Sequence, residues 1–220
     1  MPVEHQWSNR IEAIYDRYLA ALLAGSKGEC SLIVTDLLDG CIPVRTLYRE
    51  LLQKAMYQVG ELWEQNRISV AREHLATSVT EFIMTLVYPR LFAVEHCGRK
   101  AVVACVANEY HQLGARMVAD IFELNGWDGY FLGANTPVRE LLSLLEEKRP
   151  DFLALSLSVS SNLPSLLDTL KIVRESFTDL DILVGGQAFR WGGTGSVASF
   201  RNVTCLESID DLEELLRRSC

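Results

Sequence analysis

The residues best suited to chemistry in this sequence lie in the segment VVACVANEYHQLG, from Val102 to Gly114. Its first half is an apolar run typical of a strand buried in a parallel sheet, and its second half leads into an amphipathic helix. His111 therefore falls in the loop after a strand, at the sheet edge where α/β proteins bind ligands. An imidazole there can coordinate a metal, while Glu109 takes the other ring N–H and fixes the tautomer. Gly114 lets the following helix approach a bulky group closely. The competing interpretation is a loop histidine that only caps backbone groups.

Two other predicted strand ends carry unusual residues. The segment from Ser156 to Asn162 is rich in hydroxyls, including Ser160, although turn and helix-capping chemistry also favours such residues. Gly185 and Gly186 follow another strand, where an ordinary strand-to-loop turn is the alternative. Because the carboxyl ends of parallel strands meet at one edge, the three segments predict a slot that suits a long polar tail better than a small substrate.

These segments need a sheet to position them, and residues 98–220 alternate between strand and helix patterns. This alternation predicts an α/β domain with a five-stranded, doubly wound, flavodoxin-like (Rossmann-like) parallel sheet. We expect strands at residues 101–107, 129–132, 152–157, 182–184 and 203–206, and helices at 112–125, 137–148, 163–176, 194–200 and 209–218.

Residues 1–97 show only helical periodicity and form a separate predicted domain. A first helix ends at Gly25, and a second runs from Cys30 to Leu38. A third breaks near Asn66, and a fourth begins after Ser69 and ends at Pro89. Four helices with short links predict an antiparallel four-helix bundle.

The composition excludes several classes of protein. A net charge of −8 without a cluster of Lys or Arg disfavours direct binding to nucleic acid. The N-terminus has no signal-peptide pattern, and no segment is apolar enough to span a membrane, so we expect a cytoplasmic protein. The six cysteines show no metal-site spacing and are expected to be free thiols. They are Cys30, Cys41, Cys97, Cys105, Cys205 and Cys220.

The three strand-end segments together resemble the motifs of cobalamin (vitamin B12)-binding domains joined to a helical cap. That family, which includes methionine synthase, corrinoid methyl carriers and cobalamin photoreceptors, is marked by Asp-x-His-x-x-Gly, then Ser-x-Leu, then Gly-Gly. The resemblance runs from about Cys30 to Leu206. It implies that His111 is the lower axial ligand, which displaces the dimethylbenzimidazole of cobalamin from cobalt, with Glu109 as its hydrogen-bond partner.

The resemblance also implies that the freed nucleotide tail lies along the strand ends that carry Ser156, Ser160, Gly185 and Gly186. The sequence departs from the family pattern at two positions. Ser158 stands at the Leu of Ser-x-Leu, and Glu109 replaces the usual Asp. Glu-x-His is also used by the photoreceptor branch, so the second departure points toward that branch.

The helical region carries a second set of candidate residues. Trp63 is followed, after nine residues, by Glu73 and His74. A core tryptophan and a solvated first helical turn are the alternatives. The spacing resembles that of the adenosylcobalamin-binding light sensors, which implies that Trp63 packs over the upper ligand and that Glu73 and His74 contact the adenosyl pocket. Those sensors often have a histidine directly after the Trp, where this chain has Glu64.

We therefore expect a cobalamin-binding light sensor or regulatory module, with adenosylcobalamin as cofactor, rather than an enzyme. No helix-turn-helix segment precedes Ile11, so we expect signalling through a protein partner or a change of homo-oligomeric state. The alternative is a corrinoid methyl-carrier subunit of a methyltransferase system, which binds methylcobalamin. A domain pair without cofactor is a third possibility, and some relatives add a bilin chromophore.

Overall fold

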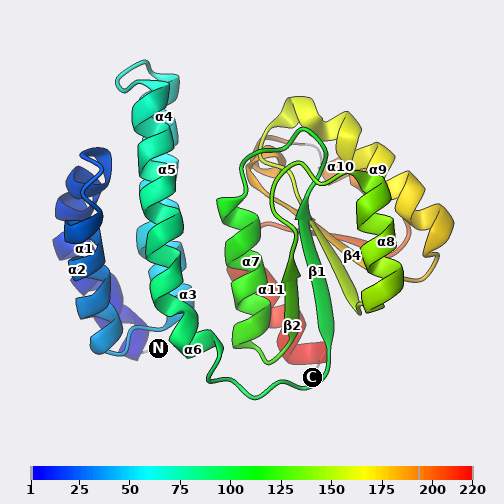
Figure 1. Ribbon diagram of the computed structural model, residues 1–220, viewed down its shortest axis with the longest axis horizontal. Helices are drawn as coiled ribbons and strands as arrows, with labels where there is room; N and C mark the ends of the chain where they lie inside the picture. Colours follow the sequence, from blue (N-terminus) through cyan, green and yellow to red (C-terminus); the bar gives the residue numbers. More distant parts are fainter. Residues whose placement is uncertain (1, 193, 220) are drawn as a thin grey trace. The chain divides into compact units, whose positions relative to one another are not determined.

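The computed structural model describes residues 2–192 and 194–219, so Met1, Gly193 and Cys220 lie outside the described residues. The chain divides into two compact units, residues 1–90 and residues 91–220 (Figure 1). This division lies at Arg90, whereas the sequence patterns place the domain boundary after residue 97. Along the described chain, no helix is long and apolar enough to cross a membrane.

The first unit is entirely helical. Two long helices, α1 (Pro2–Leu23) and α2 (Lys27–Asp39), are followed by a helical rod made of α3 (Val44–Thr46), η1 (Leu47–Gln53) and α4 (Lys54–Glu64). The chain then returns through α5 (Val70–Met84), the 3₁₀ turn η2 (Thr85–Val87) and α6 (Tyr88–Leu91). This order confirms the predicted helical N-terminal region.

The rod differs from the single α-helix that its periodicity predicts. Residues 47–53 form a π-helical stretch, in which hydrogen bonds reach one residue further than in an α-helix. Four large side chains of this stretch lie fully buried in the core of the unit: Leu47, Tyr48, Leu51 and Leu52. The predicted helix start at Ser69 is confirmed, because its Oγ accepts a hydrogen bond from the backbone N–H of Arg72 at 3.3 Å.

The second unit is a five-stranded sheet in the order β2-β1-β3-β4-β5, with every neighbouring pair parallel. This is the flavodoxin-like order that the sequence predicts. The strands are β1 (Lys100–Cys105), β2 (Asp128–Phe131), β3 (Phe152–Ser156), β4 (Asp181–Gly185) and β5 (Val203–Leu206).

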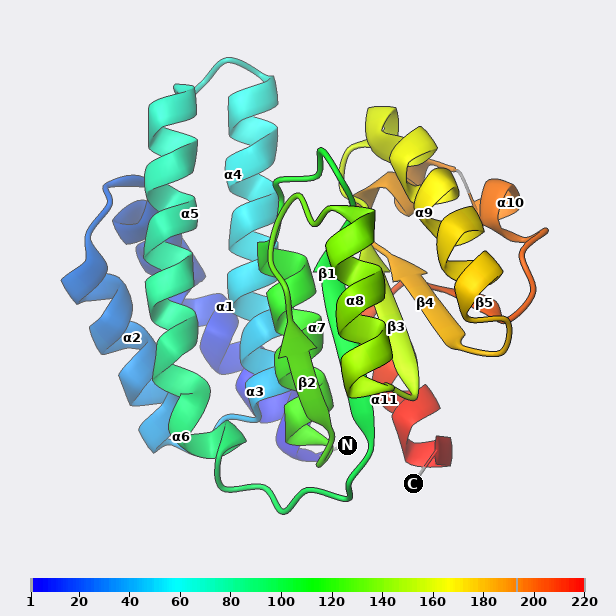
Figure 2. The same cartoon turned by 45° about the vertical axis from the view of Figure 1, so that its right-hand side comes forward.

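Helices cover both faces of this sheet, as Figure 2 shows. The pair α7 (Leu113–Leu124) and α11 (Ile209–Ser219) packs together on one face, and the pair α8 (Val138–Lys148) and α9 (Leu163–Ser176) packs together on the other. Three short turns complete the unit: η3 (Ser160–Asn162), η4 (Gln187–Trp191) and α10 (Thr194–Val197). The last is shorter than the predicted helix at residues 194–200.

The parallel register brings the predicted ligand edge together. Cys105 at the end of β1 pairs with Ser156 at the end of β3, which pairs in turn with Gly185 at the end of β4. β1 ends two positions earlier than expected, because a turn begins at once, with the N–H of Glu109 donating to the carbonyl of Val106 at 3.0 Å. The loops after β1, β3 and β4 therefore leave the sheet side by side at its carboxyl edge.

Candidate functional site

The loop after β1 presents His111 at the carboxyl edge of the sheet. The His111 side chain is 61% exposed, whereas the Glu109 carboxylate two residues earlier is fully buried. Oε1 of Glu109 lies 2.6 Å from Nδ1 of His111 and also accepts the backbone N–H of His111 at 2.9 Å. Because Nδ1 faces the Glu109 carboxylate, Nε2 is the ring nitrogen that would coordinate a metal.

The second oxygen of Glu109 joins this loop to the loop after β3. Oε2 accepts the backbone N–H groups of Ser158 and Val159, each at 2.9 Å, and the side-chain amide of Asn162 at 3.3 Å. Burial alone raises the pKa of Glu109, but the hydrogen bonds from His111, Val159 and Ser158 outweigh it and lower the pKa to about 2. Glu109 is therefore ionised at neutral pH and fixes the imidazole to the loop after β3.

The loop after β2 supports the same segment from the other side. The side-chain oxygen of Gln112 accepts the N–H of Ala134 at 3.1 Å, and the N–H of Thr136 donates to the carbonyl of Cys105 at 3.1 Å. These contacts tie the β2–α8 loop to both ends of the loop that contains His111. The anchoring of His111 thus draws on three consecutive strands of the sheet.

Three asparagines take part in this anchoring and were not expected from the sequence patterns: Asn108, Asn135 and Asn162. Asn108 and Asn135 have φ angles of 68° and 49°, in the left-handed region that asparagine tolerates better than most residues. In the sequence, these asparagines are marked only by their position a few residues after a predicted strand. Nothing in the spacing indicates that they contact one another.

Gly114 leaves open surface beside the His111 loop. It lies in the first turn of α7 and is exposed, and a Cβ built on it would meet no atom within 4 Å. The protein itself therefore does not require glycine here, whereas a broad ligand lying on the same surface would. The open surface at Gly114 and the carboxylate-fixed imidazole of His111 together fit a large planar metal complex ligated from one side.

The serines and glycines of the predicted tail slot lie along the same edge. Ser156 is half-buried between Cys105 and Gly185, and Ser160 is exposed at the start of η3. Ser158 contributes its backbone N–H to Glu109, and this group does not depend on the side chain found there. The departure from Leu at this position is thus compatible with the anchoring of Glu109.

The two glycines after β4 differ in their structural roles. Gly186 has a φ of 119°, and a Cβ there would overlap the peptide of Leu157, with 2.7 Å to its carbonyl carbon. Backbone packing alone therefore requires glycine at residue 186. At Gly185 a Cβ would lie 3.2 Å from the carbonyl oxygen of Leu206, a tight contact without positive φ.

The second candidate set lies in the helical unit. Trp63 near the end of α4 is 45% exposed, so it is not the core residue that its type alone favours. Glu73 and His74 lie in the first turns of α5, where Oε2 of Glu73 is 2.6 Å from Nδ1 of His74 and Oε1 accepts the hydroxyl of Thr77 at 2.9 Å. These three residues therefore lie at one end of the α4–α5 hairpin.

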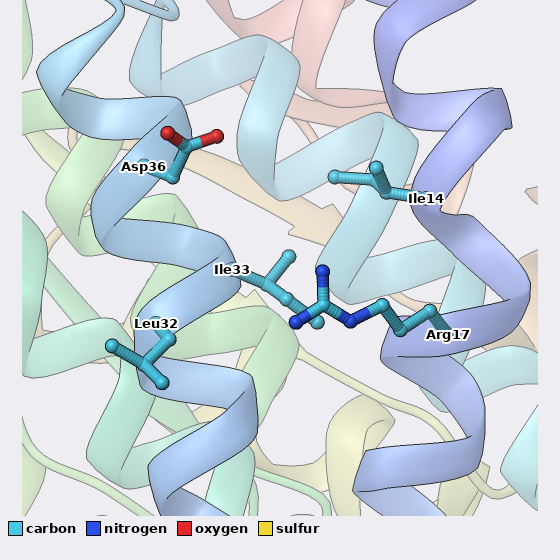
Figure 3. A pocket seen from close by; sticks show the side chains of 5 residues that line it. All are labelled: Ile14, Arg17, Leu32, Ile33 and Asp36. Atoms are coloured by element: carbon cyan, nitrogen blue, oxygen red, sulfur yellow. The ribbon is translucent and has the colours of Figure 1, made fainter.

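A depression between α1 and α2 does not share residues with either set. Its lining consists of Ile14, Arg17, Leu32, Ile33 and Asp36 (Figure 3). The charged groups in it are paired, Arg17 with Glu29 and Asp36 with Arg10, each at 2.6 Å. The depression is the groove between two salt-bridged helices and contains no group arranged for chemistry.

Comparison with known proteins agrees with this geometry. Residues 99–194 and residues 14–88 each match a family described as "B12 binding domain", and the two ranges together cover more than half of the chain. The chain is 30% identical over 179 residues to the HTH-type transcriptional repressor CarH of Myxococcus xanthus. That match covers 77% of this chain and 58% of the repressor, so the chain spans little more than half the length of this relative.

Corrinoid proteins are similar over a larger share of their length. The chain is 21% identical over 174 residues to dimethylamine corrinoid protein 1 of Methanosarcina acetivorans, covering 76% of this chain and 81% of that protein. The structure of the Methanosarcina barkeri monomethylamine corrinoid protein superposes with a TM-score of 0.82 at 14% identity, over 96% of this chain and 100% of that one, which shows a common fold. The chain therefore belongs to the B12-binding domain family, with homology both to CarH and to corrinoid proteins.

Proposed function

We propose that this cobalamin-binding chain holds cobalt through Nε2 of His111, with the dimethylbenzimidazole of the cofactor displaced. The observation that carries the proposal is the exposed imidazole whose Nδ1 lies 2.6 Å from a fully buried carboxylate that is ionised at neutral pH. Such a carboxylate partner orients an imidazole and raises its basicity as a metal ligand. The open surface at Gly114 gives room for the corrin, and Ser156, Ser160, Gly185 and Gly186 line the path of the nucleotide tail.

We further propose that the protein is an adenosylcobalamin-dependent light sensor. When bound, this cofactor supplies a cobalt–carbon bond that visible light breaks. Trp63, held 45% exposed at the end of α4, is the residue that shields the upper ligand from water, and Glu73 and His74 contact the adenosyl pocket. The 30% identity to CarH over 77% of the chain supports a regulatory role.

The output of the sensor is a change of oligomeric state or of contact with a protein partner. A fixed aromatic shield over the upper face suits sensing, because a carrier must expose that face to partner enzymes. Glu64, exposed directly after Trp63, takes the position where related light sensors often have a histidine. We therefore assign the ligand of the illuminated state to water or to His74.

The test uses the full chain loaded with adenosylcobalamin in the dark and exposed to green light. Wild type should show the red-shifted His-on absorption spectrum, and His111→Gly should lose it. Added imidazole should restore ligation in this variant because it replaces the missing side chain. Trp63→Ala should weaken retention of adenosylcobalamin or change its photolysis rate. Leu32→Ala, which removes another exposed apolar side chain of the helical unit, is the matched control.

Size-exclusion chromatography and hydrogen exchange of the helices, before and after illumination, report the output. A shift in elution or in helix protection supports the sensor. Identical profiles in the dark and after illumination would contradict the sensing role, while leaving cobalamin binding intact.

A corrinoid methyl carrier is the second candidate function. The large share of the dimethylamine corrinoid protein that this chain covers supports it. The chain spans 81% of that protein but only 58% of CarH. A carrier would transfer the methyl group of bound methylcobalamin when mixed with a methyltransferase and would tolerate Trp63→Ala. Transfer by the variant at the wild-type rate would favour the carrier over the sensor.

A further inference from the structure

All four backbone polar groups of Asn108 and Glu109, which precede Tyr110 and His111, are hydrogen-bonded. The N–H of Asn108 donates to Oδ1 of Asn135 at 2.8 Å, and its carbonyl accepts the side-chain amide of Asn162 at 3.0 Å. The N–H of Glu109 donates to the carbonyl of Val106 at 3.0 Å, and its own carbonyl accepts the N–H of Asn135 at 2.8 Å. Asn135 therefore makes two of the four contacts, one through its side chain and one through its backbone.

Apolar packing does not explain how this segment keeps its shape. Asn108 and Asn135 are both exposed and both have positive φ angles. An exposed left-handed pair is held by hydrogen bonds and backbone preference, because it buries little surface. The side-chain oxygen of Asn135 is the acceptor that fixes the Asn108 peptide, one residue before the carboxylate that orients the imidazole.

We propose that Asn135 is a positioning residue for the axial ligand, although it lies on the loop after β2 and outside the His111 segment. Its Oδ1 accepts a hydrogen bond from the Asn108 N–H. This hydrogen bond sets the direction in which the Glu109 side chain points into the protein. Glu109 in turn sets the orientation of the His111 ring. This inference rests on the proposed ligation of cobalt by His111.

Three substitutions separate the acceptor from the backbone conformation. Asn135→Gly keeps the left-handed conformation accessible and removes the acceptor, whereas Asn135→Asp keeps an acceptor oxygen in the same place. Asn202→Gly changes another left-handed asparagine (φ 53°), located before β5, and is the matched control. In every variant the backbone N–H at residue 135 is retained.

The first readout is the His-on fraction of the full chain loaded with cobalamin, measured by absorption. We expect Asn135→Gly to lower the ligation equilibrium about three- to tenfold, the size of one lost hydrogen bond, and Asn135→Asp to restore it. Asn202→Gly should match wild type. Wild-type ligation in Asn135→Gly, an equal loss in Asn202→Gly, or no restoration in Asn135→Asp would each overturn the proposal.

The second readout does not need the cofactor. In the chain without cobalamin, Asn135→Gly should speed hydrogen exchange at the Asn108 amide and shift the Nδ1 resonance of His111, and Asn135→Asp should reverse both changes. If wild type never ligates cobalt through His111, the proposed function fails, and this readout still decides the positioning role. Unchanged exchange and an unchanged resonance would overturn it.

Discussion

At the scale of single residues, the site is organised by one buried carboxylate. The two oxygens of Glu109 receive five N–H groups, two from His111, two from the backbone after β3 and one from Asn162. Charge-assisted hydrogen bonds of this kind are stronger than neutral ones, and a buried anion that lost them would be costly. Glu109, which the sequence indicates as the partner of His111, therefore also joins the loop after β1 to the loop after β3.

Replacing Glu109 by Gln should lower the stability of the sheet unit at pH 7 by about 2–3 kcal/mol, because an amide N–H₂ would face N–H donors. The pKa of Glu109 is lowered from its ordinary 4.5 to about 2, so its contribution is present above pH 4.5 and is lost as pH falls toward 2. In urea unfolding, the free energy of unfolding of wild type should thus exceed that of Glu109→Gln at pH 7, and the difference should shrink between pH 4.5 and pH 2. Glu146→Gln, at an exposed position of α8, is the control, and an advantage that did not depend on pH would contradict the assignment.

Two glycine substitutions should separate folding from cofactor binding. Gly186→Ala should destabilise the sheet unit by more than about 1 kcal/mol, because the new Cβ would overlap the Leu157 peptide at a positive φ. Gly114→Ala should leave the melting temperature unchanged or raised, since its Cβ meets nothing and alanine favours helix. The same alanine should weaken cobalamin binding, as measured by equilibrium dialysis. Wild-type affinity in Gly114→Ala would contradict the placement of the corrin beside this residue.

At the scale of elements, the segment leading from α6 to β1 is fastened to the amino-terminal end of the sheet. Nδ1 of His96 lies 2.7 Å from Asp128 at the start of β2, and its Nε2 lies 3.2 Å from Glu123 at the end of α7. The N–H of Cys97 donates to the carbonyl of Gly126 at 2.7 Å. The imidazole of His96 between two carboxylates therefore holds the connecting segment in place.

This fastening should depend on pH. The hydrogen bond to Asp128 and the charge of Glu123 raise the pKa of His96 above its ordinary 6.5. The stabilisation is therefore complete below pH 6.5 and is lost as pH rises through the raised value. Hydrogen exchange of residues 92–99 should be slower in wild type than in His96→Gln at pH 6, with the two converging at pH 9. The energy involved is below about 1 kcal/mol, because the pair is partly exposed. A difference that persisted at pH 9 would contradict this account.

The elements themselves were largely predictable, for identifiable reasons. The strands of the sheet are short apolar runs bounded by polar loops, and strand and helix alternate, so residues 203–206 match the predicted strand at both ends. The π-helical stretch at residues 47–53 was not predictable, because Leu47, Leu51 and Ala55 also fit ordinary helical spacing. The carboxyl edge was predictable from strand order, whereas the contact between Asn108 and Asn135 depends on loop conformations that periodicity does not report.

At the scale of the whole molecule, candidate groups are divided between two units. His111, Glu109 and Gly114 belong to the sheet unit, and Trp63, Glu73 and His74 belong to the helical unit. The motif spacing indicated both sets in the sequence, and the structure describes each set within its own unit. The spacing did not indicate the hydrogen bonds that anchor the His111 loop from the loops after β2 and β3, in which Thr136 and Asn162 take part.

The proposed bond between the imidazole of His111 and cobalt can be tested directly. The most direct measurement is electron paramagnetic resonance of the chain loaded with cob(II)alamin, after the protein has been labelled with ¹⁵N-histidine. Ligation by a ¹⁵N imidazole splits each cobalt line into a doublet, and the doublet should be absent in His111→Gly. A triplet in the labelled wild type would mean that the unlabelled benzimidazole of the cofactor still holds the metal, and it would contradict the account.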